Sequence, residues 1–332
     1  MFNLTSITLL KIARRILKIS LFICCCLPSL LFADDTELEQ RLKNHVEILA
    51  GPSMEGRSPG TEGSKQAAQW IARQLDAYGL KAPAQGRYQN YSNMTNVLGY
   101  VQGKSSEETI VIGAHYDHLG VEKGKTFFGA DDNASGCAAV LEIARMFAES
   151  GEVPERDIVF AFFDGEERGK LGSLHYMSIV DTPYMIKRYE PPVLMLNFDM
   201  VGRVRENKVN VFGVKTSPLL SNWLDKGVTN TDLKLNKKAL SGFNSDHLAF
   251  QAYGSPVLHF FSGYHLDYHT PRDITETVNF EGVANIVKLG FQVASQAAYY
   301  PGALAQHVRP GHPFSILAAK KLDLTHLSGE ER

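Results

Sequence analysis

The stretch Gly129-Ala130-Asp131-Asp132-Asn133-Ala134-Ser135-Gly136 places two adjacent carboxylates within a run of small residues. A helical pattern follows at 137–144. One apolar run, at 109–114, precedes the stretch and ends in His115-Tyr116-Asp117; another, at 158–163, follows it and ends in Asp164-Gly165-Glu166-Glu167. Two buried-strand patterns therefore each end in residues that can bind metal, with an acidic turn and a helix between them. Because open α/β sheets build their sites at strand ends, this order indicates a metalloenzyme.

The rest of the chain continues the alternation of strands and helices. Further strands are predicted at 95–101, 192–198, 208–212 and 256–261, with 208–212 at or near an edge. Helical patterns run from 34 to about 80 with two loop interruptions, from 133 to about 150, from 171, from 218 to 227 and from 279 to about 299. This predicts an α/β fold with a central mixed, largely parallel sheet flanked by helices on both faces. No Pro-, Gly- or Ser-rich linker divides the chain, so one catalytic domain is expected, with its site at the strand ends.

The first 33 residues differ from the rest. Their basic residues come first, at Lys11, Arg14, Arg15 and Lys18. An apolar segment follows and ends in Leu31-Phe32-Ala33. This pattern predicts a signal peptide over 1–33, which is cleaved to leave a periplasmic or secreted protein. A retained membrane anchor and a lipoprotein modified at Cys24 remain open. The catalytic domain is then predicted over 34–300, followed by an irregular C-terminal extension over 301–332.

Cleavage of that segment changes the charge and the cysteine count. The chain has 34 basic and 36 acidic residues, and the segment carries four of the basic ones and none of the acidic ones. The mature chain therefore has 30 against 36, a formal charge of −6, which argues against a nucleic-acid partner. Only Cys137 of the four cysteines remains, so no internal disulfide is possible. Its place after a glycine at a predicted helix start indicates a small buried side chain.

Candidate metal ligands cluster at the predicted strand ends and in the loops beside them. His115 and Asp117 are two apart at a strand end, so both side chains emerge on one face and the carboxylate can anchor the imidazole. Asp131 and Asp132 lie at a helix N-terminus, which favours ionised carboxylates. Helix capping accounts for one of these two acids but not for both.

Three further elements complete the pattern. Glu166 and Glu167 point in different directions, so one can bind metal while the other moves protons. Asp199 follows an apolar strand directly, and Tyr268-His269 supplies a late histidine in a loop. A solvated turn or loop explains each element alone, but their joint occurrence at strand ends favours a metal site.

These motifs closely resemble those of the secreted di-zinc aminopeptidases of the bacterial leucyl-aminopeptidase type. The resemblance rests on His115-Tyr116-Asp117, on 129–136, on Glu166-Glu167, on Asn197-Phe198-Asp199-Met200 and on Tyr268-His269-Thr270. It extends from Met54-Glu55-Gly56-Arg57 to the closing helix, which is nearly all of the mature chain. It implies hydrolysis of N-terminal residues from peptides and two Zn²⁺ per chain. No stable membrane association is expected once the predicted signal peptide is cleaved. The sequence does not indicate an oligomeric state.

The resemblance also implies the metal ligands, position by position. The five implied ligands are His115, Asp132, Glu167, Asp199 and His269. Asp132 would bridge the two ions, with His115 and Asp199 on one and with Glu167 and His269 on the other. Relatives have a cis peptide after the bridging aspartate, so a cis bond is expected between Asp132 and Asn133.

The roles of the other residues follow from the same resemblance. Two zinc ions that share a carboxylate, about 3.5–4 Å apart, clamp a hydroxide and lower the pKa of the parent water from about 15.7 to about 7. Glu166 would be the general base that takes the proton of this water and returns it to the leaving amine. Asp117 would orient His115, and Tyr268 would polarise the scissile carbonyl.

Three other functions remain open at this stage. Glutaminyl cyclases of the same fold resemble 162–167, but they generally use one zinc and lack the Asp-Asn-Ala-Ser-Gly form of the turn. A metal-free binding domain of this fold would be expected to have lost ligands or base, and all are present here. A carboxypeptidase or dipeptidase would share the zinc core, and the sequence does not identify the residues that recognise the end of the substrate.

Overall fold

The computed structural model describes residues 35–84, 86–180, 191–239, 242 and 244–304. Contacts divide the chain into two units, 1–37 and 38–332, and only 35–37 of the first are described. The predicted signal peptide and residues 305–332 of the predicted C-terminal extension therefore lie outside the described residues. No helix in the described part is both long and apolar enough to cross a membrane.

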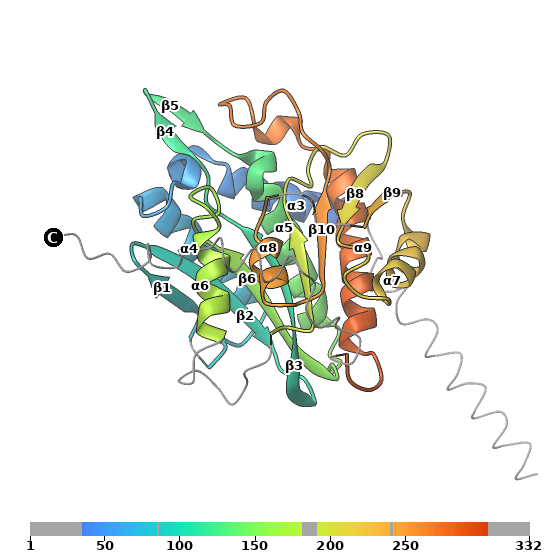
Figure 1. The fold of residues 1–332 in the computed structure, drawn as a ribbon. Helices are drawn as coiled ribbons and strands as arrows, with labels where there is room; N and C mark the ends of the chain where they lie inside the picture. Colours follow the sequence, from blue (N-terminus) through green and yellow to red (C-terminus); the bar gives the residue numbers. More distant parts are fainter. Residues whose placement is uncertain (1–34, 85, 181–190, 240–241, 243, 305–332) are drawn as a thin grey trace, which may run out of the picture. The chain divides into compact units, whose positions relative to one another are not determined.

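From Leu38 onward the chain forms an α/β domain around one mixed sheet, in which eight strands follow the order β1-β2-β6-β3-β7-β10-β8-β9 (Figure 1). Their bounds are Tyr88–Tyr91 (β1), Met94–Val101 (β2), Ser105–His115 (β3), Arg156–Phe163 (β6), Leu194–Phe198 (β7), Lys208–Phe212 (β8), Lys234–Lys238 (β9) and Val257–Phe261 (β10). The central strands β6, β3, β7 and β10 run parallel, whereas the pairs β1–β2, β2–β6 and β10–β8 are antiparallel. The predicted largely parallel, mixed sheet is confirmed. A separate hairpin joins β4 (Gly120–Glu122) to β5 (Lys125–Phe127).

Helices cover both faces of this sheet. The α-helices are α3 (Asp35–Leu49), α4 (Glu62–Ala77), α5 (Gly136–Glu149), α6 (Leu171–Val180), α7 (Leu220–Gly227), α8 (His247–Ala252) and α9 (Phe280–Ala298). Alternate strand residues point to opposite faces. On one face Val111 and Met195 pack with residues of α6 and α8. On the other, Phe160 contacts Phe147 of α5, which contacts Phe291 of α9. Strands β6, β7 and β10 are buried along their whole length, as their continuous apolar runs require.

Four short helical segments complete the secondary structure of the described residues, and N-cap residues mark where α5 and α9 begin. The segments are η1 (Pro52–Arg57), η2 (Ala130–Ser135), η3 (Val228–Asn230) and η4 (Thr275–Thr277). The closing helix begins where the pattern from 279 predicts: Asn279 is the N-cap of α9, and its side chain accepts the backbone N–H of Gly282. Helix α5 begins later than the helical pattern from 133 predicted: Ser135 is its N-cap, because Asp132 and Asn133 have non-helical dihedral angles. Asn133 Oδ1 still accepts the N–H of Gly136 at 3.0 Å, so its side chain does satisfy that helix end.

The parallel strands at the centre of the sheet bring the predicted site residues together at one edge. Because β6, β3, β7 and β10 point the same way, their carboxyl ends lie side by side. Strand β3 ends at His115, β6 is followed at once by Asp164, and β7 by Asp199. The loop after β10 carries His269, and η2 carries Asp132. Side chains that lie far apart in sequence are brought together in this way.

Candidate active site

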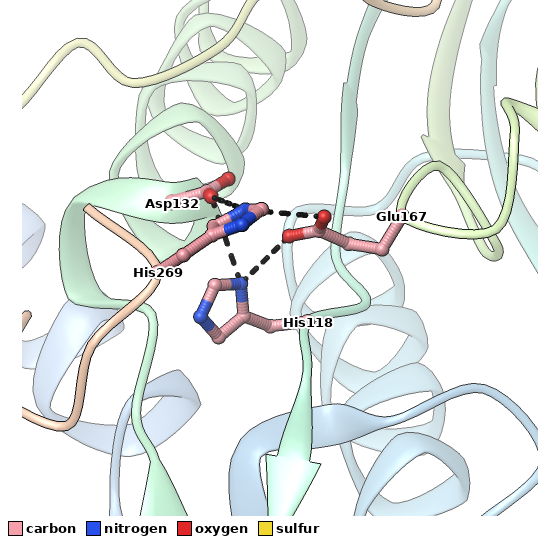
Figure 2. Close-up of side chains that lie close together, drawn as sticks. All are labelled: His118, Asp132, Glu167 and His269. Carbon is pink, nitrogen blue, oxygen red and sulfur yellow. Dashed lines mark hydrogen bonds and ion pairs between the residues drawn. The ribbon is translucent and has the colours of Figure 1, made fainter. Parts of the chain in front are cut away.

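Two groups of side chains at this edge could each hold a metal ion, and Asp132 belongs to both. The first group consists of His115, Asp132 and Asp199. The second consists of His118, Asp132, Glu167 and His269 (Figure 2). Within each group the candidate ligand atoms all lie within 4.8 Å of one another. The five residues implied as ligands are therefore brought together, and one residue that the sequence reading missed, His118, lies among them.

Asp132 directs its two carboxylate oxygens to different groups. His115 Nε2 lies 3.5 Å from Asp132 Oδ1 and 3.3 Å from Asp199 Oδ1. His269 Nε2 lies 3.1 Å from Asp132 Oδ2 and 3.2 Å from Glu167 Oε2 (Figure 2). This is the arrangement that a carboxylate bridging two ions requires.

Buried hydrogen bonds hold the acidic turn in place. The carboxylate of Asp273 accepts the backbone N–H of Asp131 at 3.0 Å and that of Asp132 at 3.0 Å. Asn133 Nδ2 donates to the carbonyl of Phe198 at 2.9 Å, which ties the turn to the end of β7. The bond between Asp132 and Asn133 is cis, as expected. The hydrogen bonds to Asp273 and Phe198 fix the acidic turn that carries the Asp132 carboxylate.

Asp117 connects His115 to the loop after β6. Its Oδ1 accepts the N–H of Glu166 at 3.0 Å, and its Oδ2 accepts the N–H of Glu167 at 3.2 Å. The same carboxylate is fully buried and lies 3.6 Å from His115 Nδ1. Asp117 is thus placed to orient one candidate ligand by its ring and another by its backbone.

A cavity opens over the first group and over Glu166. Acidic and imidazole side chains line one part of it, and aromatic side chains line another, including Phe261, Tyr264 and Tyr268. The ring of Tyr268 stacks on that of His269 with centroids 3.8 Å apart. Glu166 lines the cavity but belongs to neither donor group. It is therefore free to act on a substrate that enters there.

The electrostatics of the site favour a bound cation. Burial raises the pKa of Glu166 to about 9; repulsion from Asp246 and Asp199 adds to the rise, and His115 opposes it. Burial and the charge of Glu167 raise the pKa of Asp132 to about 6. Carboxylates packed this closely in a low-dielectric site are stabilised in their ionised form by a nearby positive charge. Imidazole and carboxylate are ligands that zinc accepts, so these residues fit two zinc ions.

The sequence did not predict the structural importance of two buried residues near the site, Arg57 and His118. Arg57 is fully buried and donates to the carbonyls of Tyr116 at 2.6 Å, Phe128 at 2.8 Å and Gly129 at 2.9 Å, and also to that of Leu49. Arg57 thereby connects the end of β3 to the segment that precedes the acidic turn at 130–135. His118 could have been suspected from its place directly after Asp117, but β3 ends at His115, so strand periodicity no longer indicates where its side chain points.

The thiol of Cys137 plays no part in this chemistry. Cys137 is fully buried at the start of α5, as predicted, and its Sγ donates to the carbonyl of His115 at 3.1 Å. Burial raises its pKa to about 12. A thiol in this state is not a nucleophile at neutral pH.

Comparison with known proteins agrees with this geometry. Peptidase family M28 matches residues 96–294, which is more than half of the chain. Aminopeptidase YwaD of Bacillus subtilis is 31% identical over 58% of this chain. The aligned part makes up 42% of that relative, so the chain spans less than half of its length.

Solved structures share the fold. The LapA aminopeptidase of Legionella pneumophila has a TM-score of 0.67 and is 22% identical, with 81% of this chain and 75% of that chain covered. The glutaminyl cyclase of Porphyromonas gingivalis has a TM-score of 0.63 and is 18% identical, with 78% of this chain and 98% of that chain covered. At these identities the likeness concerns the fold alone, and a peptidase and a cyclase match it almost equally well.

Proposed function

The chain belongs to peptidase family M28, and on this premise we propose that it is an exported, zinc-dependent aminopeptidase that removes N-terminal residues from peptides. The observation that carries the proposal is the pair of donor groups that share Asp132 beside Glu166. The name of the Bacillus subtilis relative supports the reaction class. The basic and apolar pattern of residues 1–33 supports export.

Five side chains are assigned to hold two zinc ions. His115 and Asp199 would hold one ion, Glu167 and His269 would hold the other, and Asp132 would contribute to both. Bound zinc supplies a Lewis acid that polarises a carbonyl oxygen and lowers the pKa of a coordinated water. The fit rests on the donor types and on the two oxygens of Asp132, which face different groups.

Glu166 is assigned the proton transfers. Its carboxylate takes a proton from the attacking water and delivers it to the leaving amine, a role that typically accelerates a reaction by about 10²–10⁴-fold. It needs to be ionised to begin, and neighbouring positive charge lowers the pKa that burial raises. Tyr268, which lines the same cavity, donates a hydrogen bond from its hydroxyl to the oxygen that becomes negative during attack. Asp117 accepts the backbone N–H groups of Glu166 and Glu167 and so holds their loop in position beside His115.

The principal rival is a glutaminyl cyclase of the same fold. That reaction converts an N-terminal glutamine to a ring and releases no amino acid. Enzymes of that class generally use one zinc, whereas this chain has donors for two around Asp132. The presence of both donor groups favours hydrolysis.

Substrates with defined ends test the proposal. The mature chain is incubated with aminoacyl chromogenic substrates that have a free or an acetylated amine, with a peptide that begins with glutamine, and with C-terminally amidated peptides. We expect cleavage of substrates with a free amine, no cleavage of acetylated ones, and no requirement for a free carboxyl end. Cyclisation without amino-acid release would assign the chain to the cyclases, and cleavage that depends on a free carboxyl end would make it a carboxypeptidase or dipeptidase.

A second experiment tests the bridge. Replacement of Asp132 by Asn should weaken both metal sites, because a neutral amide bridges two cations poorly. Zinc content and activity are measured after dialysis of the variant and of the wild type. Full occupancy with full activity in the variant would remove Asp132 from the mechanism.

A further inference from the structure

The second donor group contains one imidazole more than the proposed function uses. His118 is fully buried, and its Nδ1 lies 2.9 Å from Glu167 Oε1 and 3.7 Å from Asp132 Oδ2 (Figure 2). Its other ring nitrogen, Nε2, has no hydrogen-bond partner among the described residues. The nitrogen that faces polar groups is therefore Nδ1, and it faces the same two carboxylates as His269 Nε2 does.

The four side chains form a cage of the size that zinc requires. His118 Nδ1 lies 2.9 Å from Glu167 Oε1 and 3.7 Å from Asp132 Oδ2, and His269 Nε2 lies 3.2 Å from Glu167 Oε2 and 3.1 Å from the same Asp132 Oδ2. A tetrahedral zinc ion with nitrogen and oxygen ligands at about 2.0–2.1 Å holds those atoms about 3.3 Å apart. The four separations scatter around this value. In Figure 2 the four side chains converge from different elements on one point.

The position of His118 is fixed by its surroundings. Its backbone N–H donates to the carbonyl of Arg57 at 3.2 Å. Its ring packs against Gly129, where a Cβ atom would lie 2.6 Å from the ring carbons. Gly129 also has a φ of 57°, which side-chain-bearing residues rarely adopt. A glycine at this position therefore leaves the room that the imidazole occupies.

The first donor group is different. It offers three side chains, His115, Asp132 and Asp199. All three line the cavity together with Glu166; of the second group, Glu167 and the shared Asp132 line it, whereas His118 and His269 do not. A site with four protein donors is closed, and a site with three keeps a position for water or substrate. The two groups therefore have the features of a closed site and an open site.

We propose that His118 is a fourth protein donor in the Glu167–His269 group, so that this group binds zinc more tightly than the His115–Asp199 group does. The inference rests on the proposed function, because the ions are those of the peptidase centre. It adds a ligand and an order of filling: the four-donor group fills first, and the open group fills second.

X-ray absorption of the one-zinc protein tests the ligand count without any substitution. Metal-free wild-type chain receives one equivalent of zinc, and the imidazole ligands of the bound ion are counted. We expect two imidazoles, from His118 and His269. A single imidazole would overturn the inference, because both the His115–Asp199 group and a Glu167–His269 group without His118 supply only one.

Substitution of His118 separates ligation from hydrogen bonding. In His118→Asn the amide nitrogen takes the place of Nδ1, so it can still donate to Glu167 but is a poor zinc ligand; in His118→Ala both functions are lost. Zinc affinity is measured by competition with a chelator, with His175→Asn as control, because His175 stacks on Tyr91 outside both groups. Loss of an outer-shell partner costs about 10–100-fold in metal affinity. We expect both variants to weaken the tighter site by more than that, with the control unchanged.

The outcomes distinguish this inference from the proposed function. If His118→Asn binds zinc as the wild type does while His118→Ala is weakened, His118 acts by hydrogen bonding to Glu167 and the inference is wrong. If the wild type binds two ions with equal affinity, the order of filling is wrong. In both cases the proposed peptidase stands. If the wild type binds no zinc, the proposed function itself fails.

Discussion

One buried carboxylate, that of Glu142, should contribute measurably to the acid stability of the domain. Glu142 lies on α5, the helix that directly follows the acidic turn in the chain, and its side chain is fully buried. Its Oε2 lies 2.9 Å from Nε of Arg41 and 2.9 Å from Nε of Arg145. Its Oε1 lies 3.1 Å from Nε2 of His45. These partners tie α5 to α3.

The shift in the pKa of Glu142 determines how much its ionised carboxylate contributes to the free energy of unfolding. Burial opposes ionisation, but the hydrogen bond from His45 and the charge of Arg145 outweigh it and lower the pKa from 4.5 to about 2. At about 1.36 kcal/mol per pKa unit, the ionised group stabilises the folded state by about 3 kcal/mol. Because the folded pKa lies below the unfolded one, this contribution is present above pH 4.5 and is lost as the pH falls towards 2. About 2 kcal/mol of it should disappear between pH 5 and pH 3.

Urea denaturation at several pH values tests this prediction. The free energy of unfolding of the wild type should fall by about 2 kcal/mol more than that of Glu142→Gln between pH 5 and pH 3. Glu149→Gln is the matched control: Glu149 also pairs with Arg145, but its side chain is 53% exposed, so it should follow the wild type. Parallel pH profiles for the wild type and Glu142→Gln would refute the reasoning.

The other predictions concern the site and its supports. Glu166→Gln should keep its zinc and lose about 10²–10⁴-fold in kcat, whereas Glu167→Gln should lose zinc, as measured by metal analysis and steady-state kinetics; exchanged phenotypes would reverse the two roles. Tyr268→Phe should lower kcat by about 10²–10³-fold at unchanged zinc content, and an unchanged kcat would exclude its hydroxyl from the reaction. Arg57→Met should lower the free energy of unfolding by roughly 3–5 kcal/mol in urea titrations, because four carbonyls lose their donor at once; a loss below about 1 kcal/mol would contradict the role given to Arg57.

The sequence predicted the interior of the fold better than its edges. The central strands are buried on both faces of the sheet, and such strands have nearly continuous apolar sequences. They could therefore be recognised from the sequence. Strand β9 was missed, because Lys234, Lys237 and Lys238 leave it a single apolar residue, Leu235. Such polar edge strands limit pairing with other chains, and they also remove the signal by which a strand is recognised.

The site was predicted where its residues sit at the ends of regular elements. His115, Glu166 and Asp199 follow apolar strands, so the parallel sheet alone brings them to one edge. The direction of His118 depends instead on the turn after β3 and on the space at Gly129. The start of α5 was placed too early for a similar reason, since the acidic turn has non-helical dihedral angles at Asp132 and Asn133. Tertiary contacts decide such positions, and a linear pattern does not contain them.

Zinc titration of the chelator-treated mature chain tests the central claim most directly. Bound zinc per chain and the rate of hydrolysis of an aminoacyl substrate with a free amine are followed together as metal is added back. We expect no activity in the metal-free chain, saturation at two zinc ions per chain, and full activity at that point. Full activity without metal, or saturation at a single ion, would contradict it.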